Sequence, residues 1–249
     1  MFSPQIAGFR VLRASAVLLA VSCVASAPAA LLDDFSDGTD AGWTHLDLLS
    51  MFGLGHTVYD ASSGVYQISS SEALPPTFVG TGSFWTDSAT DPYFSDGYMR
   101  MRFSTDSVIS NPFSTLRLNP VSGDYYCFYA RPSGAGTIGI TRVTGLLDSE
   151  DLVATTFPIT PGAWYWMEAG ALGDTLSLKV WAEGDPEPDT AQLTTTDDSF
   201  AFGALAVGLY KYATDAGFIS SQFDDVSFIP EPSSLLLVLV LGAALARRR

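Results

Sequence analysis

The chain has 249 residues, of which 47% are hydrophobic, so it can bury the core of one domain or of two small ones. It contains 27 acidic and 12 basic residues, and between residues 31 and 229 only seven basic residues accompany 26 acidic ones. This balance excludes nucleic acid as a partner, because a polyanion would be repelled and no basic stripe is present. An acidic surface suits an exported soluble domain, or one that collects calcium.

Residues 1–29 have the pattern of a secretory signal. Arg10 and Arg13 end a basic segment, residues 14–24 form an apolar run, and small residues up to Ala29 offer a cleavage site. We therefore expect export, with cleavage after Ala29.

The two cysteines agree with this interpretation. Cys23 lies in the apolar run and leaves with the signal; a lipoprotein box around it is less favoured, because Ala20 stands where a larger aliphatic residue is usual. Cys127 then remains alone, so no internal disulfide can form. Its aromatic neighbours in "DYYCFYA" predict a buried thiol without a reactive role.

Two acidic stretches, "DDFSDGTD" and "FDDV", lie near the two ends of the segment from residue 30 to 229. If the first and last strands pair, their carboxylates could supply several of the six to eight oxygens that calcium needs. An EF-hand loop is excluded, because with Gly38 at its glycine position Thr44 falls where the bidentate glutamate belongs. The alternative is a set of solvated turn carboxylates. The candidate calcium ligands are Asp33, Asp34, Asp37, Asp40, Asp224 and Asp225.

From residue 30 to 229, short β-rich runs alternate with turn signals, and hardly any helical pattern occurs. Runs such as "GYMRMRFS", "DYYCFYA", "GTIGITRV" and "DTLSLKVWA" are rich in aromatic and β-branched residues, and several alternate with period two. Gly, Pro, Asp and Ser separate these runs. The pattern predicts an all-β fold in which two antiparallel sheets pack as a sandwich.

Aromatic residues suggest two ligand sites. Trp85 and Tyr93 lie in the loop-rich segment "GSFWTDSATDPYFSDG" and are the candidates for exposed ligand contacts. Trp164 and Trp166 alternate, so both face one side of a strand, and Trp181 lies on the following strand. These three could form a platform that stacks sugars. The favoured interpretation is nevertheless sandwich core, because large aromatics at alternating positions usually bury area.

The succession of "LLDDFSDGTDAGWT", "GAWYWMEAGALGDTLSLKVWAEGDPEP", "GALAVGLY" and "SQFDDVSF" resembles the concanavalin A/laminin G type jelly roll of many secreted bacterial proteins. The resemblance covers almost all of residues 30–229. It implies that the opening and closing strands lie near each other, and that the two tryptophan-bearing strands form a hairpin in the core. It implies little about activity, because the fold hosts lectins, enzymes and spacers alike.

Catalytic patterns are weak. Retaining glucanases of this jelly-roll fold carry Glu-x-Asp-x-x-Glu on one strand, and no such spacing occurs here. His45 and His56 are the only histidines, too few for a histidine-rich zinc site and with no nucleophile elbow to pair with. A hydrolase built from other carboxylate pairs is the remaining alternative. We therefore expect that the chain is not an enzyme.

The end of the chain combines three features in order. Pro230-Glu231-Pro232 is followed by an apolar run from Leu235 to Ala246, and then by the arginines 247–249. As a helix this run is short for a hydrocarbon core, but arginines that snorkel to the interface extend its reach and place the folded part outside. A second Pro-Glu-Pro at residues 186–188 lacks this company and is interpreted as a turn.

This order resembles the PEP-CTERM sorting signal of Gram-negative bacteria, which a membrane transpeptidase of the exosortase type recognises in species that make exopolysaccharide. The resemblance implies that residues 230–249 are a sorting domain with a transient transmembrane helix. The implied sorting residues are Pro230, Glu231, Pro232, Arg247, Arg248 and Arg249.

The sequence thus predicts a protein that stays briefly in the inner membrane and then reaches the cell surface or the extracellular space. The expected function is that of a non-catalytic surface or matrix component. Carbohydrate binding is the first alternative, with polysaccharide as the partner, and glycan hydrolysis is the second.

Overall fold

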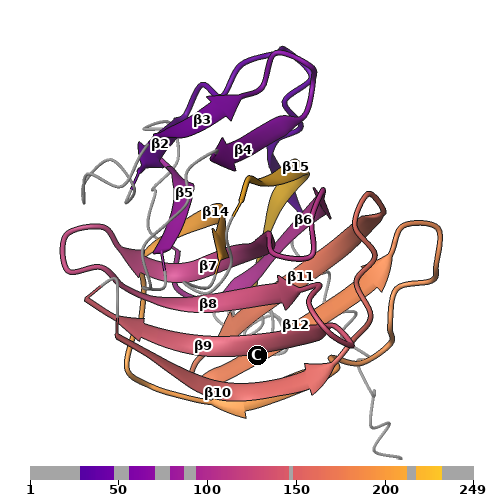
Figure 1. The fold of residues 1–249 in the computed structure, drawn as a ribbon. Coiled ribbons are helices and arrows are strands. Elements are labelled where there is room, and N and C mark those ends of the chain that lie inside the picture. The colour runs from indigo at the N-terminus through magenta and orange to yellow at the C-terminus, as the bar shows by residue number, and fades with distance from the viewer. Residues whose placement is uncertain are drawn as a thin grey trace, which may run out of the picture. The chain divides into compact units, whose positions relative to one another are not determined.

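Two antiparallel sheets make up the fold in a computed structural model whose described residues are 29–47, 56–70, 79–86, 94–145, 148–211 and 217–231 (Figure 1). Residues 27–231 form one compact unit that contains every described strand. Within this described part, no helix is long and apolar enough to cross a membrane. The predicted all-β sandwich is confirmed, whereas the signal and anchor predictions concern residues outside the described ranges.

Sheet A has eight strands, in the order β13, β12, β11, β6, β15, β4, β3, with β1 paired to β15. Their bounds are β1 Ala30–Asp33, β3 Thr57–Asp60, β4 Tyr66–Ser70, β6 Gly97–Thr105, β11 Trp164–Leu172, β12 Thr175–Ala182, β13 Leu193–Thr196 and β15 Ile219–Pro230.

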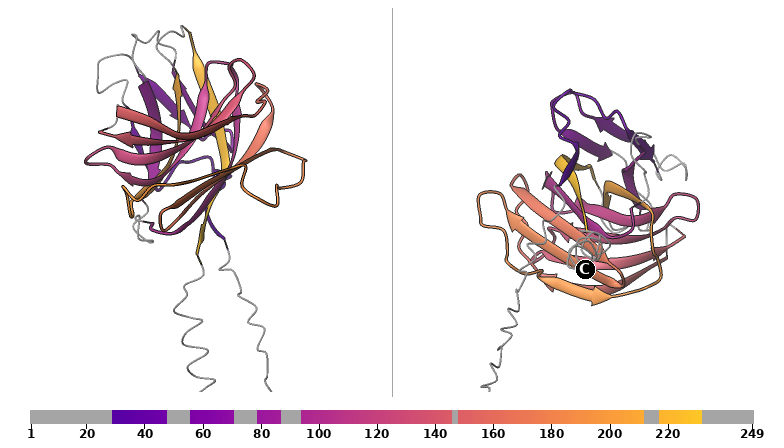
Figure 2. Two further views of the ribbon diagram at one scale, coloured as in Figure 1. Left: turned by 90° about the horizontal axis from the view of Figure 1, so that it is seen from below. Right: turned by 180° about the vertical axis from the view of Figure 1, so that it is seen from behind.

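Sheet B has seven strands, in the order β10, β9, β8, β7, β14, β5, β2. Their bounds are β2 Trp43–Leu46, β5 Val79–Trp85, β7 Asn111–Asn119, β8 Asp124–Arg131, β9 Thr137–Thr144, β10 Asp148–Thr156 and β14 Ala204–Lys211. The two sheets lie face to face (Figure 2).

The core lies between the sheets and follows the period-two pattern of the strands. On β6, Met99, Met101 and Phe103 are fully buried, whereas the residues between them point away from the core. Facing side chains such as Phe128 on β8 and Leu205 on β14 complete this layer. Burying a side chain of this size stabilises the fold by about 1.5–3 kcal/mol. The alternate positions that carry apolar residues therefore decide which side of each strand faces the core.

The first and last described strands lie side by side, as the jelly-roll resemblance implied. Ala30 pairs with Phe228 and Leu31 with Ser227. The β11–β12 hairpin is also present, and Gly173 supplies the positive φ of 56° that its tight turn requires. Cys127 is fully buried as expected, and desolvation raises the pKa of its thiol.

Candidate functional site

The outer face of sheet A, the side turned away from the core, sets aromatic and charged side chains in cross-strand rows. In one row, Trp166 lies opposite Trp181 on β12 and opposite Arg102 on β6, and Arg102 lies opposite Asp224 on β15. The next row contains Ser227, Arg100, Glu168 and Lys179. Directly opposite side chains on paired strands lie about 5 Å apart, so each row is a continuous surface.

Two of the three tryptophans of this hairpin, Trp164 and Trp166, are not core residues, so the preference for a core position was wrong for these two. Trp164 and Trp166 are half-buried, and Trp181, though only 7% exposed, is absent from the apolar cluster between the sheets. Tyr165 and Met167 have the opposite parity on β11 and enter the core instead.

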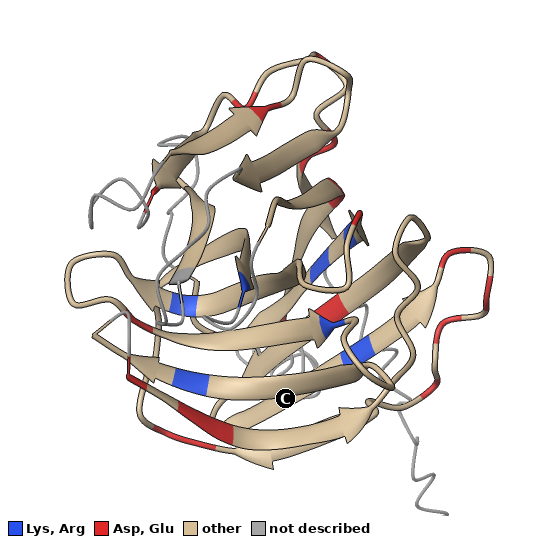
Figure 3. Cartoon of the chain, in the orientation of Figure 1, with Lys and Arg blue, Asp and Glu red and all other residues tan. Residues whose placement is uncertain are grey.

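A signal for this orientation was present in the sequence. Glu168 shares the parity of Trp166, Lys179 shares that of Trp181, and Arg100 and Arg102 alternate with core residues on β6. Charged residues are almost never buried unless paired, so a face that carries them favours solvent. All seven basic residues between positions 31 and 229 lie within strands, while most of the acidic residues that the structure describes lie in turns and loops (Figure 3).

Arg102 is the centre of one group of ion pairs on this face. Its guanidinium pairs with Asp224 and lies 2.5 Å from Oε1 of Glu183. Its Nε lies 3.0 Å from Oδ2 of Asp225, but without hydrogen-bond geometry. A bulge in β15 between Asp224 and Ser227 gives Asp225 a positive φ of 49° and brings both aspartates to the same arginine. Burial and the charge of Asp224 raise the pKa of Asp225.

Arg100 and Lys179 form a second group around two glutamates. Both cations contact Glu168, and Arg100 Nη2 and Lys179 Nζ lie 2.8 and 2.7 Å from the carboxylate of Glu187. Burial alone would raise the pKa of Glu187, but the hydrogen bond from Lys179 and the charge of Arg100 outweigh it and lower that pKa.

The arginines also fix the indoles. The guanidinium carbon of Arg102 lies 4.9 Å from the ring centroid of Trp164, and that of Arg100 lies 5.5 Å from the ring of Trp181. Trp166 stacks on Trp181 with 6.2 Å between centroids. Each cation–π contact contributes about 0.5–1 kcal/mol at exposed sites. The result is a rigid surface of aromatic rings within a frame of ion pairs.

A polar cavity of about 170 Å³ lies beside Trp164 at the edge of this surface. It is lined by Gln67 on β4, by Ser104 on β6, by Ser220 and Gln222 on β15, and by Asp106, Gly162 and their neighbours at the strand ends. It adjoins the side of sheet A that the tryptophans occupy.

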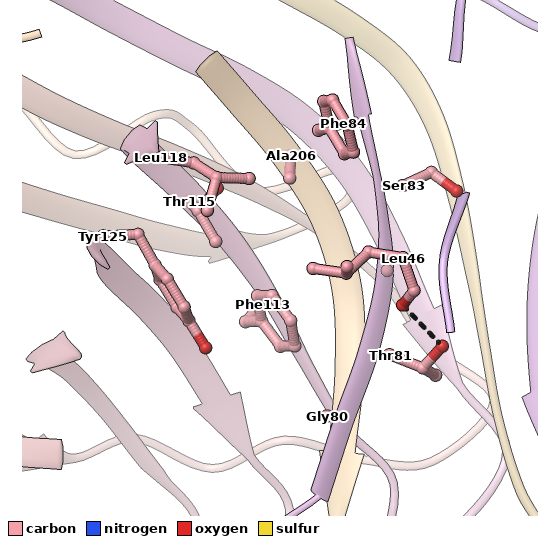
Figure 4. A pocket seen from close by; sticks show the side chains of 11 residues that line it. Leu46, Gly80, Thr81, Ser83, Phe84, Phe113, Thr115, Leu118, Tyr125 and Ala206 are labelled. Atoms are coloured by element: carbon pink, nitrogen blue, oxygen red, sulfur yellow. Dashed lines mark hydrogen bonds between the residues drawn. The ribbon is translucent and has the colours of Figure 1, made fainter. Parts of the chain in front are cut away.

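The outer face of sheet B differs in character. One cavity on it, between β2, β5, β7, β8 and β14, holds about 30 Å³ and is lined mainly by apolar side chains, among them Phe113 and Tyr125 (Figure 4). Phe113 and Tyr125 are each only 6% exposed, so neither offers an open ring face. Thr81 donates a hydrogen bond to the carbonyl of Leu46 at its margin, and the buried hydroxyl of Thr115 has no partner in the described part of the chain.

The six aspartates predicted as calcium ligands do not come together as a site. No cluster of three or more side chains suited to a metal occurs in the described residues, which include all six. Pairing of β1 with β15 does bring the two acidic stretches near each other, but Arg102 holds Asp224 and Asp225.

The N-terminal aspartates make local hydrogen bonds instead. Asp33 Oδ2 accepts from the indole N–H of Trp43 at 2.9 Å. Asp34 and Asp37 accept from backbone N–H groups two residues further on, and Asp40 contacts His45 at 2.6 Å. Each of these contacts gives a carboxylate oxygen a partner within the chain.

The two aromatic ligand candidates fare differently. Trp85 is only 5% exposed, because it pairs across the strands with Trp43 and packs edge-on against it at 5.3 Å, so the structure does not place it as an exposed contact. Tyr93 lies outside the described residues.

The proposed sorting residues are described only in part. Pro230 is the last residue of β15, opposite Gly97, and the N–H of Glu231 donates to the carbonyl of Asp96 at 3.3 Å. Pro232 and Arg247, Arg248 and Arg249 lie outside the described residues, so the role of this motif stays a prediction.

Comparisons with solved structures establish a concanavalin A/GH16-like jelly roll. SCLam, a non-specific endo-β-1,3(4)-glucanase from family GH16, has a TM-score of 0.57 at 13% identity, over 82% of this chain and 91% of that one. The carbohydrate binding module CBM66 from Bacillus subtilis has a TM-score of 0.51 at 16% identity, over 74% and 93%. No protein-family model and no curated protein matches the chain.

A prokaryotic β-1,3-1,4-glucanase (lichenase) derived from a mouse hindgut metagenome shares the fold with a TM-score of 0.54 at 13% identity, over 80% of this chain and 97% of that one. At such identities the likeness concerns the fold. The expectation that the chain is not an enzyme is nevertheless contradicted, because the lichenase and SCLam, which share this fold, are glucanases.

Proposed function

We propose that this chain is an exported polysaccharide-binding protein and that the glycan lies along the outer face of sheet A. The observation that carries the proposal is the position of Trp164 and Trp166, half-buried on a solvent-facing strand surface rather than in the core. An indole offers a sugar a flat apolar surface for its C–H groups, and flanking charged side chains hydrogen-bond its hydroxyls.

The ion-pair frame adds to this proposal. Because Arg102 lies over Trp164, and Arg100 over the Trp181 partner of Trp166, the rings are held before any ligand arrives. Preorganisation lowers the entropy lost on binding. The presence of a carbohydrate binding module among the fold neighbours supports the same function.

Replacing both Trp164 and Trp166 with alanine tests the proposal. We expect at least about a tenfold loss of affinity for neutral polysaccharides, measured by affinity electrophoresis and calorimetry, because truncating a central aromatic anchor typically costs more than about 1 kcal/mol. Phe202→Ala is the control, since it removes a side chain that is 65% exposed outside sheet A. Equal affinities of the double variant and the wild type would refute the proposal.

Hydrolysis of the bound glycan is the second candidate function. Glu183 and Asp225, whose side chains are both 42% exposed, meet at Arg102 beside Trp164, and glycoside hydrolysis needs a pair of carboxyl groups. Release of reducing ends in the same binding assays measures this activity. If no reducing ends are released from any bound polysaccharide, hydrolysis is refuted as a function.

The proposed localisation rests on the sequence of the two ends. The signal pattern of residues 1–29 supports export, and the order from Pro230 to Arg249 supports passage through the inner membrane to the surface with an exosortase-type transpeptidase as partner. Membrane fractionation of a variant with alanine at positions 230–232 tests this localisation. We expect the variant to insert into the inner membrane as the wild type does, but not to be released from it. Unchanged release would contradict it.

A further inference from the structure

The cavity beside Trp164 is built by one cross-strand row of sheet A. Gln67 on β4 lies opposite Gln222 on β15, Gln222 lies opposite Ser104 on β6, and Ser104 lies opposite Trp164 on β11. All four side chains lie on the outer face, because at least one chain neighbour of each, such as Tyr66 or Phe223, enters the core. The row thus runs from two amides through a hydroxyl to an indole.

The next row toward the strand ends creates the space. It contains Ser220 on β15, Asp106 just beyond β6, and Gly162 just before β11, which has no side chain. Backbone bonds fix this row: the N–H of Asp106 donates to Ser220 O at 3.3 Å, and the N–H of Gly162 donates to Thr105 O at 2.7 Å. Small residues beside a row of long ones leave the hollow of about 170 Å³.

Polar groups remain available in this hollow. Gln67 Nε2 donates to Ser220 Oγ at 2.8 Å, which fixes the first amide. In the described part of the chain, the amide of Gln222 and the hydroxyl of Ser104 make no side-chain hydrogen bond. One primary amide and one hydroxyl beside an indole can donate to and accept from the hydroxyls of a sugar while its C–H face contacts the ring.

The charge of the cavity defines the class of sugar. Among the described residues that line it, Asp106 alone is charged. Arg102, which holds the neighbouring ring of Trp164, is already surrounded by Glu183, Asp224 and Asp225. A uronic acid or a sulfated sugar would bring a second negative charge next to Asp106, and the guanidinium of Arg102 is already paired with three carboxylates.

We propose that this cavity is a subsite for one neutral sugar ring of the bound polysaccharide, held by Trp164, Gln222 and Ser104, and that Asp106 excludes uronic acid units. The inference rests on the proposed function of the outer face. It adds to that function a position for one ring and a selection against anionic glycans.

The test uses the full chain and soluble polymers of known charge. Mixed-linkage β-glucan, xylan and levan are the neutral probes, and polygalacturonate is the anionic probe, all measured by affinity electrophoresis at equal ionic strength. Gln222→Leu weakens binding of the neutral polymer with the highest affinity about tenfold, because the hydroxyls of the sugar lose their amide partner. Ser177→Ala, on the same face beside Gly170, is the matched control and binds like the wild type. Gln222→Glu keeps the size of the side chain and serves if Gln222→Leu fails to fold.

Asp106→Asn tests the selectivity. It raises the affinity for polygalacturonate about tenfold and changes neutral binding less than about twofold, because a repulsive charge is removed without loss of volume. If wild type binds polygalacturonate as tightly as the neutral polymers, the exclusion is overturned. If both Gln222 variants bind like wild type while the Trp164 and Trp166 variant has lost binding, the subsite is overturned and the proposed function stands. Absence of binding to every polymer overturns both.

Discussion

The outer faces of the two sheets place aromatic side chains in opposite ways. On sheet A, Trp164 and Trp166 are half-buried among ion pairs. On sheet B, Phe113 and Tyr129 are buried against glycines: a Cβ on Gly208 would come within 2.5 Å of the Phe113 ring, and one on Gly139 within 2.4 Å of the Tyr129 ring. Charged neighbours keep an aromatic ring at the solvent-facing surface. A glycine on the next strand allows an aromatic ring to lie against the backbone.

The largest expected effect separates the two faces by stability. Phe113→Ala should lower the free energy of unfolding by about 3 kcal/mol, the cost of truncating a buried phenylalanine, whereas Trp166→Ala should lower it by about 1 kcal/mol. Urea denaturation of both variants measures this difference. Equal losses would mean that the Trp166 ring is part of the core energetics after all.

A glycine pair gives an intermediate effect. Gly208→Ala on sheet B should cost about 2 kcal/mol by overpacking, because its new Cβ would also lie 2.5 Å from the carbonyl oxygen of Thr81, a backbone atom. Gly170→Ala on sheet A should cost less, about 1 kcal/mol, because the atoms nearest to its Cβ would belong to the side chains of Ser177 and Tyr98, which can rotate. The midpoints of thermal unfolding rank the two variants. A larger loss of stability for Gly170→Ala than for Gly208→Ala would contradict the comparison between the sheets.

The smallest expected effect is on the pH dependence of stability. Burial alone would raise the pKa of Asp197, but hydrogen bonds from Ser199 and Tyr126 and the charge of Arg142 lower it; the pKa of Glu187 is lowered by Lys179 and Arg100. Both carboxylates therefore stabilise the fold above about pH 4, and this stabilisation is lost as the pH falls through their lowered values.

Asp197 should contribute more to this loss than Glu187, because its side chain is 8% exposed and that of Glu187 is 37% exposed. Asp197→Asn is thus expected to flatten the acid limb of the stability profile more than Glu187→Gln, as denaturant midpoints between pH 6 and pH 3 would show. A profile of Asp197→Asn that matches the wild type would contradict this assignment.

The strands and the two-sheet architecture could be predicted because their signals are local. Period-two alternation in "GYMRMRFS" places Met99 and Met101 inside and Arg100 outside without knowledge of any partner strand. The outward position of Trp166 could also have been inferred, from Glu168 two residues on. The size of an indole favours burial, but at Trp164 and Trp166 the charges of the neighbouring side chains outweigh it.

The rest depends on register between distant strands. The burial of Trp85 follows from its pairing with Trp43, and the cavity requires Gln67, Ser104 and Gln222 in one row. The sequence of a single strand does not reveal which residues of another strand lie opposite it. The calcium prediction failed for a related reason. The sequence contains the carboxylates, but it does not show the bulge in β15 that turns Asp224 and Asp225 to Arg102.

The position of β15 has a consequence for the kinetics of folding. It is the last described strand, yet it lies inside sheet A between β6 and β4, and its hydrogen bond from Gln67 to Ser220 closes a span of 153 residues. Contacts this distant require a large loss of chain entropy before they stabilise anything, so such topologies fold slowly. Sheet A therefore stays incomplete during synthesis until residues 219–230 have emerged from the ribosome, because β6 and β4 have no partner between them before that point.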